Sequence, residues 1–241
     1  MKIGFILMIL ILCFSIAYAV DTETVGEATY TWVAVKSDPD VFMNARTALE
    51  NIGFKNTGDI SGAINLVSIA EKFCNSYGGV LLWESHGAKD ASGKVYIAVE
   101  KYPYNDEGYS QAVDRAQTLM SGAYYSNGDL DVIYLIEDPG YWVCLTDQGI
   151  SNKFYGNNAI ALIAACYGGL TCDWGARARV GYNGSVESST AETDMSNLVN
   201  CLTAQGNDYS KMTVSLALQG TQVVSGDANT IPFPFGTGQV I

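Results

Sequence analysis

The sequence is poor in basic residues, in histidine and in proline, and each shortage excludes a class of protein. Its 13 Lys and Arg residues stand against 25 Asp and Glu residues, which gives a net charge of −12. A chain this acidic repels phosphate backbones, so nucleic acid is a poor candidate partner. The chain has 1 histidine and no Cys-x-x-Cys pair, so the ligand spacing of a structural zinc site is absent. With 5 prolines, it has no proline-rich linker.

The rest of the composition is that of a folded domain. Hydrophobic residues make up 48% and charged residues 16%, which excludes a disordered or fibrous chain. A length of 241 residues is enough to bury a core, and the sequence contains no internal repeat. Composition therefore predicts an acidic, single-domain protein of the α/β or all-β class.

Residues 1–19 have the features of a secretory signal peptide. Lys2 supplies a positive charge, residues 3–16 are almost entirely apolar, and an Ala-Tyr-Ala cleavage pattern ends at Ala19. Cleavage there would leave residues 20–241 as one exported domain, secreted or periplasmic, in a compartment that permits disulfides. The alternative is an uncleaved N-terminal anchor, which the short apolar run disfavours. No later segment is long and apolar enough to span a membrane.

The cysteine count predicts at least one unpaired thiol. One of the six cysteines, Cys13, lies in the expected leader, and the other five are Cys74, Cys144, Cys166, Cys172 and Cys201. Five is an odd number, so one thiol must remain without a partner in an oxidising compartment. We expect at least one disulfide among the cysteines other than Cys166. The preferred pair is Cys172 with Cys201, which would tie a loop to the helix that follows it.

Strand and helix patterns alternate along the chain. The expected strands are residues 29–35, 80–84, 95–99, 159–164 and 178–182, with a hairpin formed by residues 131–136 and 141–145. The expected helices are residues 41–52, 62–77 and 109–120, and two more within 189–219. This alternation favours a sheet of about six strands, mainly parallel, with helices on both faces. The continuous apolar runs 80–84 and 159–164 are expected to be its adjacent central strands.

Two residues with catalytic chemistry follow the two central strands. His86 comes just after the run Val80–Glu84, and Cys166 comes just after Ile160–Ala164. Ligands of open parallel sheets gather beyond the carboxyl ends of the strands, so the two side chains are expected to share a cleft. A thiolate attacks carbonyl carbon, and a nearby imidazole moves the proton to the leaving amine. This pairing predicts nucleophilic catalysis.

The motifs GGVLLWESHG and NAIALIAACYGG resemble those of caspase-like (clan CD) cysteine peptidases, in which one strand ends in His-Gly and a later one in Ala-Cys. Residues 144–150 and 176–182 are also similar to the segments that flank the nucleophile strand in bacterial CHAT domains. The closest pattern is that of CHAT and gingipain-type domains. The resemblance covers about residues 80–219. It implies a caspase-like three-layer α/β sandwich.

The resemblance also implies a function. It implies a secreted cysteine endopeptidase that acts on protein or peptide substrates, with His86 and Cys166 as a catalytic dyad and no metal or organic cofactor. Gly87, Ala165 and Gly168 would lie beside the oxyanion and the substrate. The alternative is a catalytically silent caspase-like module for binding or surface interaction. The cleavage preference does not transfer, because the residues that set it vary between families.

The spacing between the two candidate catalytic residues departs from the family pattern, and two roles are open for Glu84. His86 and Cys166 are 80 positions apart (166 − 86), which is longer than usual in these families. The extra length falls mostly between Gly87 and Tyr141, in a tyrosine-rich stretch suited to an added strand, a helix or a lid. Glu84 is expected either to orient His86 or to be a solvated strand residue.

Overall fold

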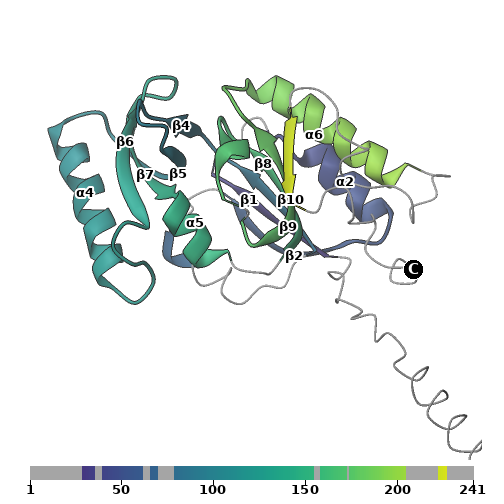
Figure 1. Ribbon diagram of the computed structural model, residues 1–241, viewed down its shortest axis with the longest axis horizontal. Helices are drawn as coiled ribbons and strands as arrows, with labels where there is room; N and C mark the ends of the chain where they lie inside the picture. Colours follow the sequence, from purple (N-terminus) through teal and green to yellow (C-terminus); the bar gives the residue numbers. More distant parts are fainter. Residues whose placement is uncertain are drawn as a thin grey trace, which may run out of the picture.

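The structure is a computed structural model that describes residues 29–35, 40–61, 66–69, 79–154, 158–172, 174–204 and 222–226. Its centre is a six-stranded sheet, sheet A, in the order β10-β9-β8-β3-β1-β2 (Figure 1). The strands are β1 (Thr29–Ala34), β2 (Lys55–Ser61), β3 (Val80–Glu84), β8 (Asn158–Ala164), β9 (Ala176–Tyr182) and β10 (Gln222–Gly226). Neighbouring strands are parallel except β9 and β10, which are antiparallel at one edge. The prediction of an α/β fold with a mostly parallel sheet is confirmed.

The two apolar runs that flank the site residues form the middle of sheet A, as predicted. β3 pairs in parallel with β8 on one side and with β1 on the other. All five side chains of β3 are buried, because apolar clusters cover both faces. Val80 and Leu82 pack on one face, whereas Leu81 and Trp83 pack on the other. This two-residue alternation explains why the first four residues of the strand, Val80–Trp83, are all apolar.

The long interval between His86 and Cys166 folds into a second sheet. Sheet B is four-stranded and antiparallel, in the order β4-β5-β7-β6. Its strands are β4 (Gly87–Lys89), β5 (Val95–Tyr102), β6 (Leu130–Leu135) and β7 (Gly140–Thr146), and α4 (Asp106–Ser121) connects β5 to β6. The expected hairpin is therefore present as β6 and β7. The expected strand at residues 95–99 is present as well, but it belongs to sheet B.

Helices cover sheet A on both faces (Figure 1). α2 (Met43–Asn51) and α6 (Ser188–Thr203) pack on one face and enclose the first apolar cluster. On the other face lie α5 (Asp147–Lys153), the helical residues 66–69 and sheet B. The second apolar cluster runs from sheet A through sheet B to α4. Two helices thus cover one face of sheet A, and helices and a second sheet share the other.

Three strands were not expected from the sequence: β2, the three-residue β4 and the edge strand β10. β2 has the polar sequence KNTGDIS and pairs with β1 alone, at the edge of sheet A. Ile60 is its one side chain in the buried apolar clusters. An edge strand needs little apolar surface, so its sequence lacks the alternation that marks a half-buried strand.

Some sequence predictions fall outside the described residues. These are the signal peptide at residues 1–19, most of the helix expected at 62–77, and the second helix expected after Gly206. In the part of the chain that the structure covers, no helix combines the length and apolarity needed to cross a membrane.

Candidate active site

The sheet register brings His86 and Cys166 to equivalent positions. Glu84 at the end of β3 is paired with Ala164 at the end of β8. The pairing continues one residue further, because Ser85 N–H donates a hydrogen bond to Ala164 O at 3.2 Å. His86 and Cys166 therefore each lie two residues beyond a matched pair, at the carboxyl edge of sheet A. Ligands of open parallel sheets gather at this edge.

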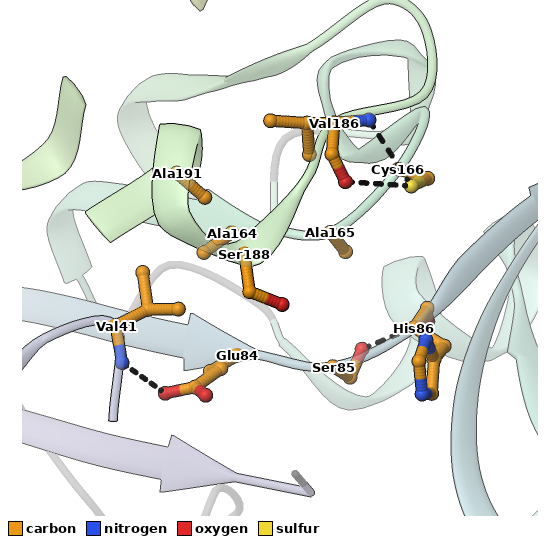
Figure 2. Close-up of a pocket in the computed structure, with 10 residues that line it drawn as sticks. All are labelled: Val41, Glu84, Ser85, His86, Ala164, Ala165, Cys166, Val186, Ser188 and Ala191. Carbon is orange, nitrogen blue, oxygen red and sulfur yellow. Dashed lines mark hydrogen bonds between the residues drawn. The ribbon is translucent and has the colours of Figure 1, made fainter. Parts of the chain in front are cut away.

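Both residues line one cleft (Figure 2). The cleft lies between the carboxyl ends of β3 and β8 and the N-terminal ends of α2 and α6, and its free volume, with the open mouth included, is about 370 Å³. Its lining residues are Val41, Glu84, Ser85, His86, Ala164, Ala165, Cys166, Val186, Ser188 and Ala191. Glu84 is 4% exposed, and its Oε2 accepts a hydrogen bond from Val41 N–H at 3.1 Å, so it is not the solvated strand residue of one sequence expectation. The shared cleft that the sequence predicted is thus present.

The Cys166 thiol is held by the backbone of Val186. Its Sγ lies 3.5 Å from Val186 O and accepts a hydrogen bond from Val186 N–H at 3.3 Å. Burial raises the pKa of this thiol above its ordinary value, the Val186 backbone opposes that shift, and the negative charge of Glu137 adds to it. At neutral pH the resting thiol is therefore protonated, and it must lose its proton before it attacks a carbonyl carbon.

The raised pKa of Cys166 gives a pH prediction. We expect its alkylation by iodoacetamide to be slow at neutral pH and to rise tenfold per pH unit until the pH passes the ordinary thiol value of about 8.5, without levelling there. Glu137→Gln removes a nearby negative charge and should speed labelling at neutral pH by about twofold, a small effect because Glu137 is exposed to solvent and salt. Mass spectrometry of the labelled protein at several pH values measures both. A thiol that is fully reactive at neutral pH would contradict the prediction.

His86 is held by sheet B. Its Nε2 lies 3.2 Å from Asp138 Oδ2, and its ring meets the Trp142 ring edge-on at a centroid distance of 5.4 Å. Its backbone carbonyl accepts a hydrogen bond from Ala98 N–H at 2.9 Å. Ser85 links the same carbonyl to the core, because its hydroxyl donates to His86 O at 3.0 Å and accepts from the Trp83 indole at 3.0 Å. The inserted sheet thus fixes the orientation of the imidazole.

Asp138 is the site residue that the sequence analysis missed. Burial alone would raise the pKa of this carboxyl, but hydrogen bonds and charge from Lys101 and His86 hold it below its ordinary value. The carboxylate is therefore ionised at neutral pH and stabilises the protonated imidazole of His86. The sequence marked Asp138 as part of a hairpin turn, and nothing in that turn indicated a contact with a residue 52 positions away.

Replacing Asp138 with asparagine tests this role. Removal of the negative charge should lower the pKa of His86, so the limb of the pH–rate profile that reports His86 should move to lower pH. If His86 acts as the general acid and base that the sequence predicts, the catalysed rate should fall by roughly 10–100-fold, part of the 10²–10⁴-fold that general acid–base catalysis supplies. Asp138→Glu should restore part of the rate. Asp131→Asn is the matched control, because Asp131 pairs with Lys94 in the same sheet. An unchanged pH profile would exclude the role.

The glycine after His86 provides space for protein backbone. A Cβ at Gly87 would lie 1.9 Å from the carbonyl oxygen of Cys166, so only glycine lets the two site loops approach this closely. His86, just before β4, and Ala98 of β5 form a hydrogen-bonded pair of an antiparallel ladder. Such pairs alternate with pairs that exchange no hydrogen bonds, so the next pair, Gly87 with Ile97, exchanges none. The N–H of Gly87 therefore points away from β5. This leaves it a candidate donor to an oxyanion.

The other two residues expected beside the oxyanion have structural roles. Gly168 N–H donates to Ala165 O at 3.0 Å, and a Cβ at Gly168 would lie 2.6 Å from the Ile163 side chain. Ala165 borders the cleft, but its side chain is 1% exposed and packs in the second apolar cluster. Gly168 begins η1 (Gly168–Leu170), a short turn that follows the cysteine. The expected oxyanion role is thus compatible with the geometry at Gly87, whereas the N–H of Gly168 already has an acceptor.

Tyr167, directly after Cys166, has an unusual backbone conformation. Its φ of 60° lies in the left-handed region, which costs a non-glycine residue roughly 1–2 kcal/mol. The conformation is held by a hydrogen bond from Tyr167 N–H to Gly184 O at 2.9 Å. The Lys89 ammonium lies 5.1 Å from the centre of the Tyr167 ring. Backbone strain of this kind is concentrated at functional sites.

Arg179 supports the loop that follows Cys166. It is 8% exposed, and its guanidinium donates hydrogen bonds to Gly169 O at 2.9 Å and to Cys172 O. Trp174 supports the same loop, because its indole N–H donates a hydrogen bond to Thr171 Oγ1 at 2.7 Å. The centroid of its ring lies 4.8 Å from that of Trp83. Trp83 also donates a hydrogen bond to Ser85, as described above. One aromatic cluster therefore anchors both loops of the cleft.

The expected Cys172–Cys201 disulfide is not formed. No disulfide joins Cys144, Cys166, Cys172 and Cys201, the four cysteines within the described residues. Cys172 packs against the cluster between sheets A and B, and Cys201 packs against the cluster under α2 and α6. The two lie on opposite faces of sheet A, which prevents a bond between them. Cys74 lies outside the described residues.

No protein-family model and no curated protein matches this chain.

Proposed function

We propose that this chain is a secreted cysteine endopeptidase with a caspase-like three-layer fold, in which Cys166 is the nucleophile and His86 is the general acid and base. The observation that carries the proposal is the matched register of β3 and β8. It sets the one histidine of the sequence and Cys166 at equivalent positions in one cleft. The mostly parallel sheet with helices on both faces supports the fold assignment. The leader pattern at residues 1–19 supports export.

The first half of the reaction transfers the acyl group to the enzyme. Cys166 Sγ attacks the peptide carbonyl carbon, the thiol proton passes to His86, and a C–S bond forms in a tetrahedral intermediate. The Gly87 N–H is suited to stabilise the oxyanion. His86 then gives its proton to the amide nitrogen, the C–N bond breaks, and the amine leaves. Cys166 is left as a thioester.

The second half is hydrolysis of that thioester. Water adds to the thioester carbonyl and gives a proton to His86, which returns it to the departing sulfur. The products are a carboxylic acid and the original thiol, so the cycle consumes one water molecule and balances without a cofactor. Throughout, the Asp138 carboxylate stabilises the imidazolium form of His86. In the resting structure Cys166 Sγ is hydrogen-bonded to Val186, and His86 Nε2 is hydrogen-bonded to Asp138. We therefore infer that bound substrate brings the thiol and the imidazole within reach of each other.

A peptide mixture tests the proposal. The purified chain, residues 20–241, is incubated with peptides from a digested proteome, and new peptide ends are identified by mass spectrometry. We expect new ends with the wild-type protein and with a Cys172→Ala control, and none with Cys166→Ala. New ends that persist in Cys166→Ala would contradict the proposal. Absence of new ends with all three proteins would favour the silent binding module, with which the buried and protonated thiol is also compatible.

A further inference from the structure

Four tyrosines form a patch on the surface of sheet B and α4. Tyr104 precedes α4, Tyr109 lies in its first turn, and Tyr134 and Tyr141 are a cross-strand pair of β6 and β7. The centroids of their rings lie 4.5–6.0 Å apart in the pairs that touch. Tyr104, Tyr109 and Tyr134 are 62%, 50% and 40% exposed. These four residues are called the tyrosine patch below.

Packing of the core does not explain the tyrosine patch. Tyr141 packs against the second apolar cluster, but the other three rings contact Tyr141 and are exposed to solvent. α4 contributes Ala112, Ala116 and Leu119 to that cluster instead. None of the four hydroxyls has a hydrogen-bond partner within the described residues. A contiguous group of exposed aromatic rings, unlike a single one, marks a surface that binds another molecule.

The turn between β6 and β7 connects the tyrosine patch to the candidate active site. It contains Asp138, which is hydrogen-bonded to His86, and Glu137, whose negative charge opposes ionisation of the Cys166 thiol. Ile136 lies in the same turn and is 78% exposed, more than any other large hydrophobic side chain of the described residues. The turn therefore borders the site on the His86 side and presents an exposed apolar side chain there.

The position of His86 decides which half of the substrate reaches the tyrosine patch. His86 protonates the leaving amine, and β4 of sheet B begins at the next residue, so the amine half of the substrate meets sheet B. Tyr141 is three residues after Asp138, a span of about 10 Å at 3.3 Å per residue. Neighbouring residues of a strand face opposite sides, so Tyr141 faces away from Trp142, which contacts His86. The amine half would thus pass around the turn, over Ile136.

We infer that the tyrosine patch binds the polypeptide that follows the cleaved bond, with a preference for apolar or aromatic side chains about four to six residues after it. The inference rests on the proposed function. The rings supply apolar contact, and their unpaired hydroxyls suit the polar groups of a peptide backbone. Asp106 and Glu107 are exposed at the start of α4, between Tyr104 and Tyr109 in the sequence, and their charge disfavours an acidic segment. The preferred substrate is therefore an extended chain rather than a short peptide.

Three amidated, quenched fluorescent peptides test the inference. They share one sequence that is cut in the peptide mixture. The first ends two residues after the cleaved bond, the second continues for six residues with Phe at the fourth and fifth, and the third has Asp at those two positions. We expect kcat/KM for the Phe peptide to exceed that for the short peptide by about tenfold, mainly through a lower KM, as one or two aromatic contacts supply. The Asp peptide should be no better than the short one.

Removal of the two most exposed rings tests the surface itself. Tyr104→Ala combined with Tyr109→Ala should bring kcat/KM for the Phe peptide to within about twofold of the short peptide, whose own rate should be unchanged. Tyr124→Ala is the matched control, because Tyr124 is 39% exposed and follows α4 outside the patch, and it should leave all three rates unchanged. Calorimetry with Cys166→Ala should show the same tenfold loss in binding of the Phe peptide when the two tyrosines are replaced. Thermal unfolding checks the fold of each variant.

The outcomes separate this inference from the proposed function. Cleavage that depends on Cys166 but is equal for the short and the Phe peptides, or that keeps its preference without the two tyrosines, overturns the inference and leaves the peptidase intact. A preference for the Asp peptide overturns it as well. A change from dimer to monomer without the two tyrosines, measured by light scattering, would assign the patch to a second copy of the chain and overturn the inference. If the peptide mixture itself is not cut, the proposed function fails and the inference fails with it.

Discussion

Cys166→Ala removes the nucleophile, and we expect peptide hydrolysis to fall by at least about 10⁴-fold while the fold is unchanged. His86→Ala should lower the rate of peptide hydrolysis by about 10²–10⁴-fold, because it removes general acid–base catalysis but leaves the thiol in place. The double variant should be about as slow as Cys166→Ala alone, since groups that act as one unit are not additive. Steady-state kinetics on one fluorogenic peptide measures all three.

Two controls accompany this series. Cys172→Ala removes another thiol of the same loop region and should leave the rate unchanged within about twofold, as expected for a residue outside the reacting groups. Thermal unfolding of each variant checks the fold. Full activity in Cys166→Ala would exclude Cys166 as the nucleophile and end this account, whereas no hydrolysis by the wild type would favour the silent binding module.

Gly87→Ala should disrupt the site through a backbone collision. The new Cβ would lie 1.9 Å from Cys166 O and 3.0 Å from its carbonyl carbon, and no side-chain rotation relieves contact with backbone. We expect a loss of about 3 kcal/mol of unfolding free energy, at the upper end for overpacking. That loss corresponds to a decrease in Tm of roughly 6–12 °C for a chain of this size. Peptide hydrolysis should be lost even below the new Tm, because the two loops must separate.

Gly184→Ala is the matched control for this substitution. Gly184 lies in the neighbouring loop and bonds to Tyr167 through its carbonyl, but a Cβ there would meet no atom within 4 Å. Calorimetry should show Gly184→Ala within about 1 kcal/mol of the wild type. Equal effects from the two substitutions would mean that the close approach of the two loops is not what Gly87 provides.

The sequence predicted the centre of the fold well, because burial on both faces requires a continuous apolar run. Residues 80–84 and 159–164 could be identified as adjacent strands on that ground, and the register then placed His86 and Cys166 together. β2 could not be identified in this way, because a polar edge strand is stabilised by pairing with β1 more than by burial.

The support around the dyad could not be predicted from the sequence. Asp138 contacts His86 from a hairpin that belongs to a separate sheet, and the position of that sheet depends on packing across the second apolar cluster. Local patterns identified the hairpin but carry no information on what its turn meets. The Cys172–Cys201 pairing was wrong for a similar reason. Proximity along the chain suggested a link between two segments that sheet A separates.

The most direct test of the account is to alkylate the nucleophile with a peptide-directed reagent, whose carboxylate group leaves as the C–S bond forms. A peptidyl acyloxymethyl ketone forms a stable thioether with a catalytic cysteine, and mass spectrometry locates it. Trypsin releases Cys166 and Cys172 in one peptide, between Lys153 and Arg177, so fragment ions must distinguish the two sulfurs. The account predicts one label per chain, on Cys166. Labelling should not occur when the protein is unfolded before the reagent is added, and it should be slower in His86→Ala. A label on Cys172 or Cys201, or no label on the folded protein at all, would contradict it.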